Sequence, residues 1–175
     1  MKKLYSLLAC AAITATITTH AMDPNTRNPL FKLIDPFIGN TVRGTSSNWQ
    51  GIFSILQKLT SNGLVPFTVN EYLSPEGHTL LCHAIEDNDF LAAKILIEKY
   101  NANPNGKTLT GMTPLMFACK DGYEDLVVLL LQHGADPLIQ NNNGNDSFFF
   151  AETYAKYNIM KDDTVLRILK TYKRK

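Results

Sequence analysis

The sequence has almost no net charge. Its 17 Lys and Arg face 16 Asp and Glu, which gives a formal charge of +1 over 175 residues. Without Lys2 and Lys3, which lie in a segment expected to be removed, 15 basic residues face 16 acidic ones and the charge is −1. A chain without excess positive charge has no general attraction for nucleic acid or anionic membranes. We therefore expect neither as a partner.

Long apolar runs are also scarce, and only residues 1–21 hold one. Lys2 and Lys3 precede an uncharged apolar run over 4–17, and small residues flank an expected cut after Ala21. This layout is typical of a cleaved secretory signal peptide. An uncleaved anchor is the alternative, which the polar end of the segment disfavours because a span needs about 20 continuous apolar residues. We expect a periplasmic or secreted protein with no membrane span in the mature chain.

Lipid attachment at Cys10 is a second alternative for this segment. Residues 7–10 (LLAC) loosely resemble a lipobox, but only six residues separate Lys3 from Cys10. That apolar stretch is too short for a lipoprotein signal, so cleavage after Ala21 is favoured over lipidation.

Catalytic motifs are absent from the sequence. It contains no His-Glu-x-x-His, no Gly-x-Ser-x-Gly and no Walker-type phosphate loop. Cys82 and His83 are adjacent, but neighbours on a helix point about 100 degrees apart and share a proton poorly. We expect no catalytic residue and no cofactor, and we interpret the chain as something other than an enzyme.

The histidines give no sequence signal for a metal. His78, His83 and His133 do not share a metal-ligand spacing. We interpret them as surface histidines and expect no metal site.

The sequence does contain an internal period. Its 45% hydrophobic and 19% charged content is that of a folded domain. Gly77, Gly111 and Gly144 are 34 and 33 residues apart, and a threonine or aspartate and an alanine recur at the same offsets. A fixed period of this length is typical of stacked repeats.

The clearest unit runs over 111–136. Thr113 is a good N-cap, and Pro114 suits the first helical position. Gly122 ends that first helix, because glycine readily adopts the left-handed conformation. A second, more apolar helix over 126–131 follows, and Gly134 ends it. The pattern predicts a helix-turn-helix pair.

These residues resemble the ankyrin repeat. The matches are Thr113-Pro114-Leu115, Ala118, Gly122, Leu129-Leu130 and Gly134-Ala135-Asp136, and the preceding unit matches at Gly77, Thr79, Leu81, Ala84, Leu96 and Ala102-Asn103. The resemblance implies an all-α fold, a short solenoid of helix-turn-helix units joined by hairpin-like turns. The predicted organisation is a signal peptide (1–21), an extended arm (22–45), a degenerate N-terminal capping unit (46–73), repeat 1 (74–107), repeat 2 (108–140) and a divergent C-terminal repeat or cap (141–175).

The sequence departs from the family pattern at the turn histidine, where Cys82 and Met116 stand. These turns are expected to lose a polar brace, which suggests modest stability. Cys82 and Cys119 fall on first helices of neighbouring repeats, three positions out of step, too far apart for a disulfide. We expect two buried free thiols. Phe148, Phe149 and Phe150 cannot all point inward, so at least one is expected to be exposed.

The resemblance implies that a partner contacts the turn tips and the outer face of each first helix, a surface that is concave in the family. The positions carried over are Glu76, His78, Glu86, Asp87 and Phe90 in repeat 1, Leu109, Thr110, Met112, Lys120, Asp121, Tyr123 and Glu124 in repeat 2, and Asn142, Asn143, Asn145, Thr153 and Tyr154 in the third unit. Phe90, Met112 and Tyr123 are the expected anchors, because aromatic and large apolar side chains dominate interface energy.

Two functional interpretations remain open at this point. The first is a monomeric protein-binding module exported by a bacterium, with another protein of unknown identity as its partner. The second is an inhibitor or immunity-like partner of a co-produced enzyme or toxin. A third, an uncharacterised enzyme, has no support in the residues.

Overall fold

The computed structural model describes residues 47–61, 69–71, 74, 77–157 and 163–172. Over these ranges it contains seven α-helices, one 3-10 helix and no strand. They are α3 (Trp49–Ser61), η3 (Val69–Glu71), α4 (Leu80–Glu86), α5 (Phe90–Tyr100), α6 (Pro114–Asp121), α7 (Glu124–Gln132), α8 (Ser147–Tyr157) and α9 (Thr164–Tyr172). The predicted all-α class is confirmed. The expected signal peptide and arm, and Glu76, lie outside the described residues.

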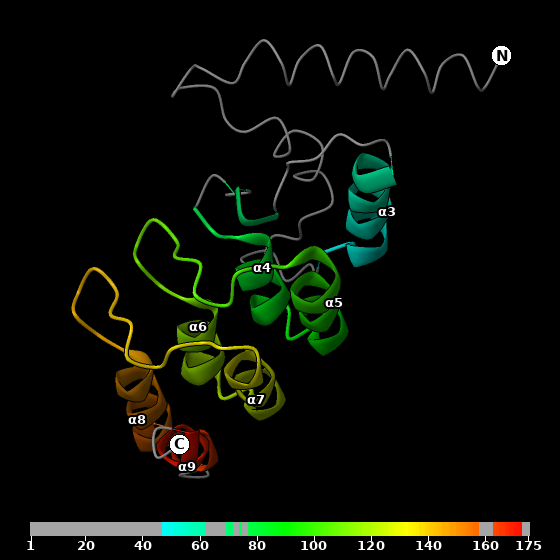
Figure 1. Ribbon diagram of the computed structural model, residues 1–175. Helices are drawn as coiled ribbons and strands as arrows, with labels where there is room; N and C mark the ends of the chain where they lie inside the picture. The colour runs from blue at the N-terminus through cyan, green and yellow to red at the C-terminus, as the bar shows by residue number, and fades with distance from the viewer. Residues whose placement is uncertain (1–46, 62–68, 72–73, 75–76, 158–162, 173–175) are drawn as a thin grey trace, which may run out of the picture.

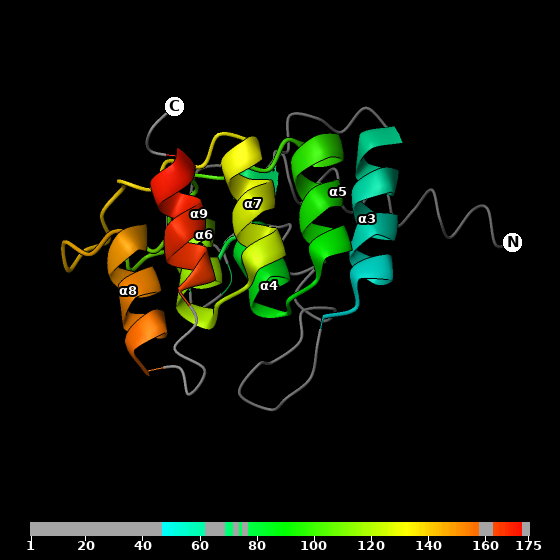
Figure 2. The same cartoon turned by 90° about the horizontal axis from the view of Figure 1, so that it is seen from below.

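The helices form two rows. The first helices of the units, α4, α6 and α8, make one row, and α3, α5, α7 and α9 make the row beside it (Figure 1). Helices pack within each pair and between neighbouring units, as in α4 on α6, α6 on α8, α5 on α7 and α7 on α9. Viewed from below, the helices stand next to one another with roughly parallel axes (Figure 2). The architecture is the expected solenoid.

The helix α6 begins and ends where the sequence predicts, whereas α7 begins at Glu124, two residues before the expected start. The hydroxyl oxygens of Thr79 and Thr113 accept hydrogen bonds from the first turns of α4 and α6, and the Asp89 carboxylate does the same for α5. Pro114 occupies the first turn of α6, where its missing N–H costs nothing. Gly122 ends α6 with a φ of +74°. The N-cap bonds of Thr79 and Thr113 are kept although Cys82 and Met116 replace the family's histidine.

The loop before each first helix has a tip, and the three tips are closed in the same way. The backbone N–H groups of Ser74, Thr108 and Asn141 donate to the carbonyl oxygens of the residues four positions later, His78, Met112 and Asn145. Each tip thus spans five residues. The side-chain oxygen of its first residue in turn accepts a hydrogen bond from the backbone N–H of its fifth residue. The glycine between them has a φ of +78° to +81°, which favours glycine. These tips are the source of the period in the sequence.

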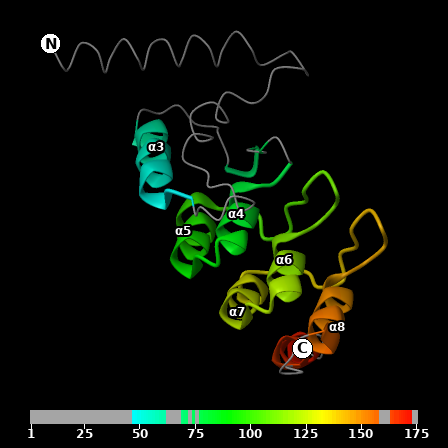
Figure 3. The ribbon, with the colours of Figure 1, turned by 180° about the vertical axis from the view of Figure 1, so that it is seen from behind.

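The two complete loops that carry the second and third tips project past the row of α4, α6 and α8, on the same side (Figures 1 and 3). Side-chain amides join them. Asn105 donates to the carbonyl oxygen of Gly134 at 3.0 Å and accepts from the N–H of Asp136 at 2.8 Å. Asn142 donates to the carbonyl oxygen of Leu109 at 3.0 Å. These bonds fix the spacing of neighbouring tips.

The core lies between the rows and continues into the C-terminal unit. Leu80, Leu115 and Leu130 are fully buried, and Leu169 of α9 is equally inaccessible. The second helix of that unit is α9. Phe149 is 47% exposed, as the three consecutive phenylalanines require. Among the described helices, none has both the length and the apolar character needed to cross a membrane.

Candidate functional site

The predicted site residues of repeat 2 gather where α6 ends and α7 begins. Lys120 Nζ lies 4.0 Å from Asp121 Oδ1. Tyr123 precedes the first residue of α7 and is half-buried against the core. Lys120, Asp121 and Tyr123 therefore share one patch of the surface, although the end of α6 lies between Asp121 and Tyr123.

The carboxyl group of Asp121 lies in an unfavourable environment. Partial burial raises its pKa, the nearby Lys120 ammonium lowers it, and the Glu86 carboxylate of repeat 1 raises it again. Burial also raises the pKa of Tyr123, and Asp121 and Tyr154 raise it further. These effects connect Glu86 of repeat 1, Asp121 and Tyr123 of repeat 2, and Tyr154 of the third unit into one continuous electrostatic group.

The tips place three predicted residues at one equivalent position. His78, Met112 and Asn145 each end a tip, so the same backbone presents an imidazole, a thioether and an amide in succession. Met112 is half-buried, and its Sδ atom accepts from Asn141 Nδ2 at 3.4 Å. Asn143 is exposed at the third tip, with its N–H donated to Asn141 Oδ1.

We call these residues the first-helix surface: His78, Glu86, Met112, Lys120, Asp121, Tyr123, Asn143 and Asn145. His78, Met112, Asn143 and Asn145 belong to the tips, whereas Glu86, Lys120, Asp121 and Tyr123 lie at or just beyond the ends of α4 and α6. All eight are among the positions that the resemblance implies for partner contact.

Asp87 makes internal bonds instead. Its Oδ2 atom accepts from the N–H of Ser47 at 3.0 Å and from the indole Nε1 of Trp49 at 3.1 Å. Asp87 also forms the C-cap of α4. The residue therefore attaches the N-terminal unit to repeat 1.

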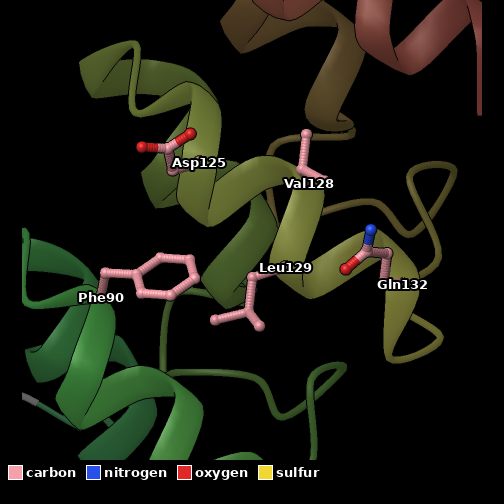
Figure 4. A pocket seen from close by; sticks show the side chains of 5 residues that line it. All are labelled: Phe90, Asp125, Val128, Leu129 and Gln132. Atoms are coloured by element: carbon pink, nitrogen blue, oxygen red, sulfur yellow. The ribbon is translucent and has the colours of Figure 1, made fainter.

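Phe90 lies apart from the first-helix surface. It is the first residue of α5, in the row of α3, α5, α7 and α9, which we call the outer row. Phe90 and residues of α7 line a groove of about 370 Å³ there. The other lining residues are Asp125, Val128, Leu129 and Gln132. Figure 4 shows the Phe90 ring and the Leu129 side chain facing the same space, with Asp125 and Gln132 beside it. The sequence did not indicate this groove, because it depends on how α5 and α7 pack.

The interpretation of the histidines as surface residues is wrong for His83. It is buried, with 7% of its area exposed. His83 lies in a cluster with His78 and Glu86 in which one ligand atom from each residue is within 4.8 Å of the others. The i,i+3 spacing of His83 and Glu86 was a signal for two of the three residues of this cluster, since such residues share a helix face. The approach of His78 depends on the first tip.

The two described cysteines are free and buried, as expected. Burial raises the pKa of Cys82 to about 12, and it raises the pKa of Cys119 as well. Both thiols are therefore protonated at neutral pH, the unreactive form of cysteine. Their role in the structure is packing.

Comparison with known families agrees with the repeats seen in the fold. A family model described as ankyrin repeats (3 copies) matches residues 47–141, more than half of the chain. The chain belongs to the ankyrin-repeat family. The match includes the degenerate N-terminal unit, whereas the helix pair α8 and α9 extends the ankyrin stack beyond it.

Several curated proteins share these ankyrin repeats. Palmitoyltransferase AKR1 of Candida glabrata is 32% identical over 61% of this chain and 14% of its own length. Protein phosphatase 1 regulatory subunit 27 of Mus musculus is 36% identical over 42% of this chain and 47% of its own. The 2-5A-dependent ribonuclease of Homo sapiens is 39% identical over 43% of this chain and 10% of its own.

The chain thus spans less than half the length of each of these relatives. Their names describe different activities, so the shared part is the ankyrin repeat and not those activities. Ankyrin repeats generally mediate protein–protein interaction, and the fold is typically non-catalytic.

Proposed function

We propose that this ankyrin stack is a protein-binding module whose partner contacts the first-helix surface. The observation that carries the proposal is the row of half-buried ionisable groups that runs from Glu86 through Asp121 to Tyr123. Burial of Asp121 disfavours its charged form, and the contact with Lys120 is long, at 4.0 Å between Nζ and Oδ1. A donor from a partner would remove that cost. Perturbed ionisable groups at a surface are typical of functional sites.

The tips give a second reason for this surface. They keep one hydrogen-bonding pattern while their fifth residue changes from His78 to Met112 to Asn145. A rigid backbone that presents different side chains at regular spacing can recognise a partner without reorganising, and preorganisation favours binding.

Binding, not catalysis, is the proposed activity of the whole chain. Cys82 and Cys119 have raised pKa values and are buried, so neither provides a thiolate nucleophile at neutral pH. The family fold is typically non-catalytic, which supports the same proposal.

Export completes the proposal. The basic start, apolar run and small-residue end of residues 1–21 favour cleavage after Ala21. The protein would then meet its partner in the periplasm or outside the cell.

The test is affinity capture with the tagged chain followed by mass spectrometry, comparing Tyr123→Ala on the first-helix surface with Phe90→Ala on the outer groove. We expect Tyr123→Ala to weaken retention of the partner by about tenfold or more, as for an aromatic anchor. Phe90→Ala serves as the matched aromatic control and should retain the partner. The same spectra report the mature N-terminus, expected at Met22.

Equal retention by wild type and a folded Tyr123→Ala variant would contradict the proposed surface. Since Tyr123 packs partly on the core, Lys120→Glu provides a second variant at an exposed position of the same patch. Loss of the partner in Phe90→Ala alone would move the binding site to the groove between α5 and α7.

A second candidate is that the partner is an enzyme which this chain regulates. The phosphatase regulatory subunit from mouse is matched over 47% of its length, a larger share than the other two relatives described. An inhibitor or immunity-like role of this kind would be supported if the captured partner is an enzyme whose activity changes when the purified chain is added.

A further inference from the structure

A His-His-Glu cluster lies where the first tip meets α4. His78 follows Gly77 of the tip, whereas His83 and Glu86 are three residues apart on α4 and share a helix face. One oxygen, Glu86 Oε2, lies 2.9 Å from His78 Nδ1 and 3.6 Å from His83 Nδ1. One carboxylate oxygen therefore faces two imidazole nitrogens.

The repeat itself does not require these three residues. Repeat 2 has the same backbone and places Met112, Phe117 and Lys120 at the positions equivalent to His78, His83 and Glu86, 34 residues later. Its tip closes with the same hydrogen bonds, and its first helix has the same N-cap. The cluster is a property of repeat 1 and not of the ankyrin framework.

The donor atoms suit a metal of the zinc type. Two imidazoles and one carboxylate form a set that binds Zn²⁺ with bond lengths of about 2.0 to 2.2 Å, so that tetrahedral ligands lie about 3.4 Å apart. The separations of 2.9 and 3.6 Å, with all three ligand atoms within 4.8 Å, bracket that value. Small side-chain rotations would bring the three atoms to coordination distance.

The surroundings also favour a cation. His83 is buried, while the side chains of His78 and Glu86 keep 24% and 17% of their area exposed, which leaves a path from solvent. The His78 ring lies against the rings of His83 and Phe117, with centroids 5.5 and 5.3 Å apart, and this packing restricts its orientation. The Asp121 carboxylate interacts electrostatically with Glu86 and adds a second negative charge near the cluster.

We propose that His78, His83 and Glu86 form a binding site for one Zn²⁺ ion or a similar divalent transition metal. Three protein ligands leave a fourth coordination position for water. The bound ion would fasten the first tip to α4. This inference does not depend on the proposed partner-binding function.

Calorimetric titration of the EDTA-treated full chain with ZnCl₂ tests the proposal. His83→Phe and His78→Met replace the ligands with the residues that repeat 2 carries at the same positions, and Glu86→Gln keeps the shape of the side chain. We expect one Zn²⁺ per wild-type chain and a loss of affinity of about a hundredfold in each variant. Mutating a residue that only hydrogen-bonds to a metal ligand already lowers metal affinity by up to about a hundredfold.

His133→Ala is the matched control, because His133 forms a separate pair with Glu98 at 3.7 Å that has no third ligand among the described residues. It should bind Zn²⁺ like the wild type. Zn²⁺ should also raise the thermal unfolding midpoint of the wild type and of His133→Ala, but not of the three ligand variants. Circular dichroism of each variant reports folding separately.

Co²⁺ then identifies the donor atoms. A visible spectrum of tetrahedral Co²⁺ without a thiolate charge-transfer band is expected for two nitrogens and one oxygen. Unchanged Zn²⁺ affinity in the folded variants, or a thiolate band that assigns the metal to cysteine, would overturn the proposal.

Discussion

At the scale of single residues, Asp121 shows how a position on the surface can oppose folding. Its folded pKa is raised, mainly by burial. Below the pKa of the unfolded chain the carboxyl is neutral in both states. As the pH rises through the raised pKa of the folded state, the free energy of unfolding falls below its value in acid, because the folded environment disfavours the charged carboxylate. At neutral pH, ionised Asp121 therefore destabilises the fold.

We predict that Asp121→Asn keeps or raises the thermal unfolding midpoint at pH 7, and that this advantage shrinks as the pH falls below the ordinary range of an aspartate. The pKa of Tyr123 should fall in the variant, because one of the charges that raise it is removed. The chain has seven tyrosines, so the titration should be followed by residue-resolved NMR of the Tyr123 ring. A lower unfolding midpoint at pH 7 would show that the pairing with Lys120 outweighs burial.

At the scale of elements, α3 is joined to repeat 1 through Asp87. The carboxylate accepts from Ser47 and from the Trp49 indole, both at the start of α3. Trp49 is 7% exposed. A half-buried acceptor shared by two donors couples the position of α3 to the end of α4, so a position that looks variable in the repeat has an internal role.

Replacing Asp87 with Ala should release the start of α3 and cost about 1 to 3 kcal/mol, because two buried donors lose a charged acceptor. Trp49 is the one tryptophan in the sequence, so its fluorescence reports this element directly and should shift to longer wavelength. Asp89→Ala is the matched control. It removes the N-cap of α5 and should lower stability without shifting the Trp49 emission.

At the scale of the whole molecule, each helix pair packs mainly on its neighbours along the stack. Stability in such a solenoid is close to a sum of unit and interface terms. The C-terminal unit lies at one end of the described stack, where α9 packs on α7 and α8. We therefore expect a defect in α9 to act locally.

Leu169→Ala tests this expectation, because Leu169 is fully inaccessible in α9. The cavity should cost about 2 to 5 kcal/mol. Hydrogen exchange should become faster in α8 and α9 while α4 and α5 keep their protection, and Lys170→Ala, at an exposed position of the same helix, should change neither. Equal acceleration in every helix would mean that the stack opens as one unit.

Much of this fold could be predicted from the sequence because the repeat specifies its backbone locally. Gly77, Gly111 and Gly144 mark turns that need a positive φ, and Thr79 and Thr113 mark helix starts. The apolar residues of α9 also recur at helical spacing.

The site was only partly predictable, because side-chain contacts between units do not follow from the period. Glu86, Asp121 and Tyr123 were expected on one surface, and the structure brings them together. Phe90 was assigned to the same surface, but it lies against α7 in the outer row. Asp87 was expected at the partner surface, whereas the start of α3 occupies its carboxylate.

The sequence alone determined the all-α class, the turn glycines, the caps and the burial of the two free thiols, because each depends on backbone conformation or apolar spacing within one unit. Only the tertiary structure decided which side chains meet. The closure of the first tip sets His78 against Glu86 and His83, and the stacking of α4 on α6 sets Glu86 near Asp121. Such distances depend on how rigid units are oriented in space, and a one-dimensional pattern does not specify that orientation.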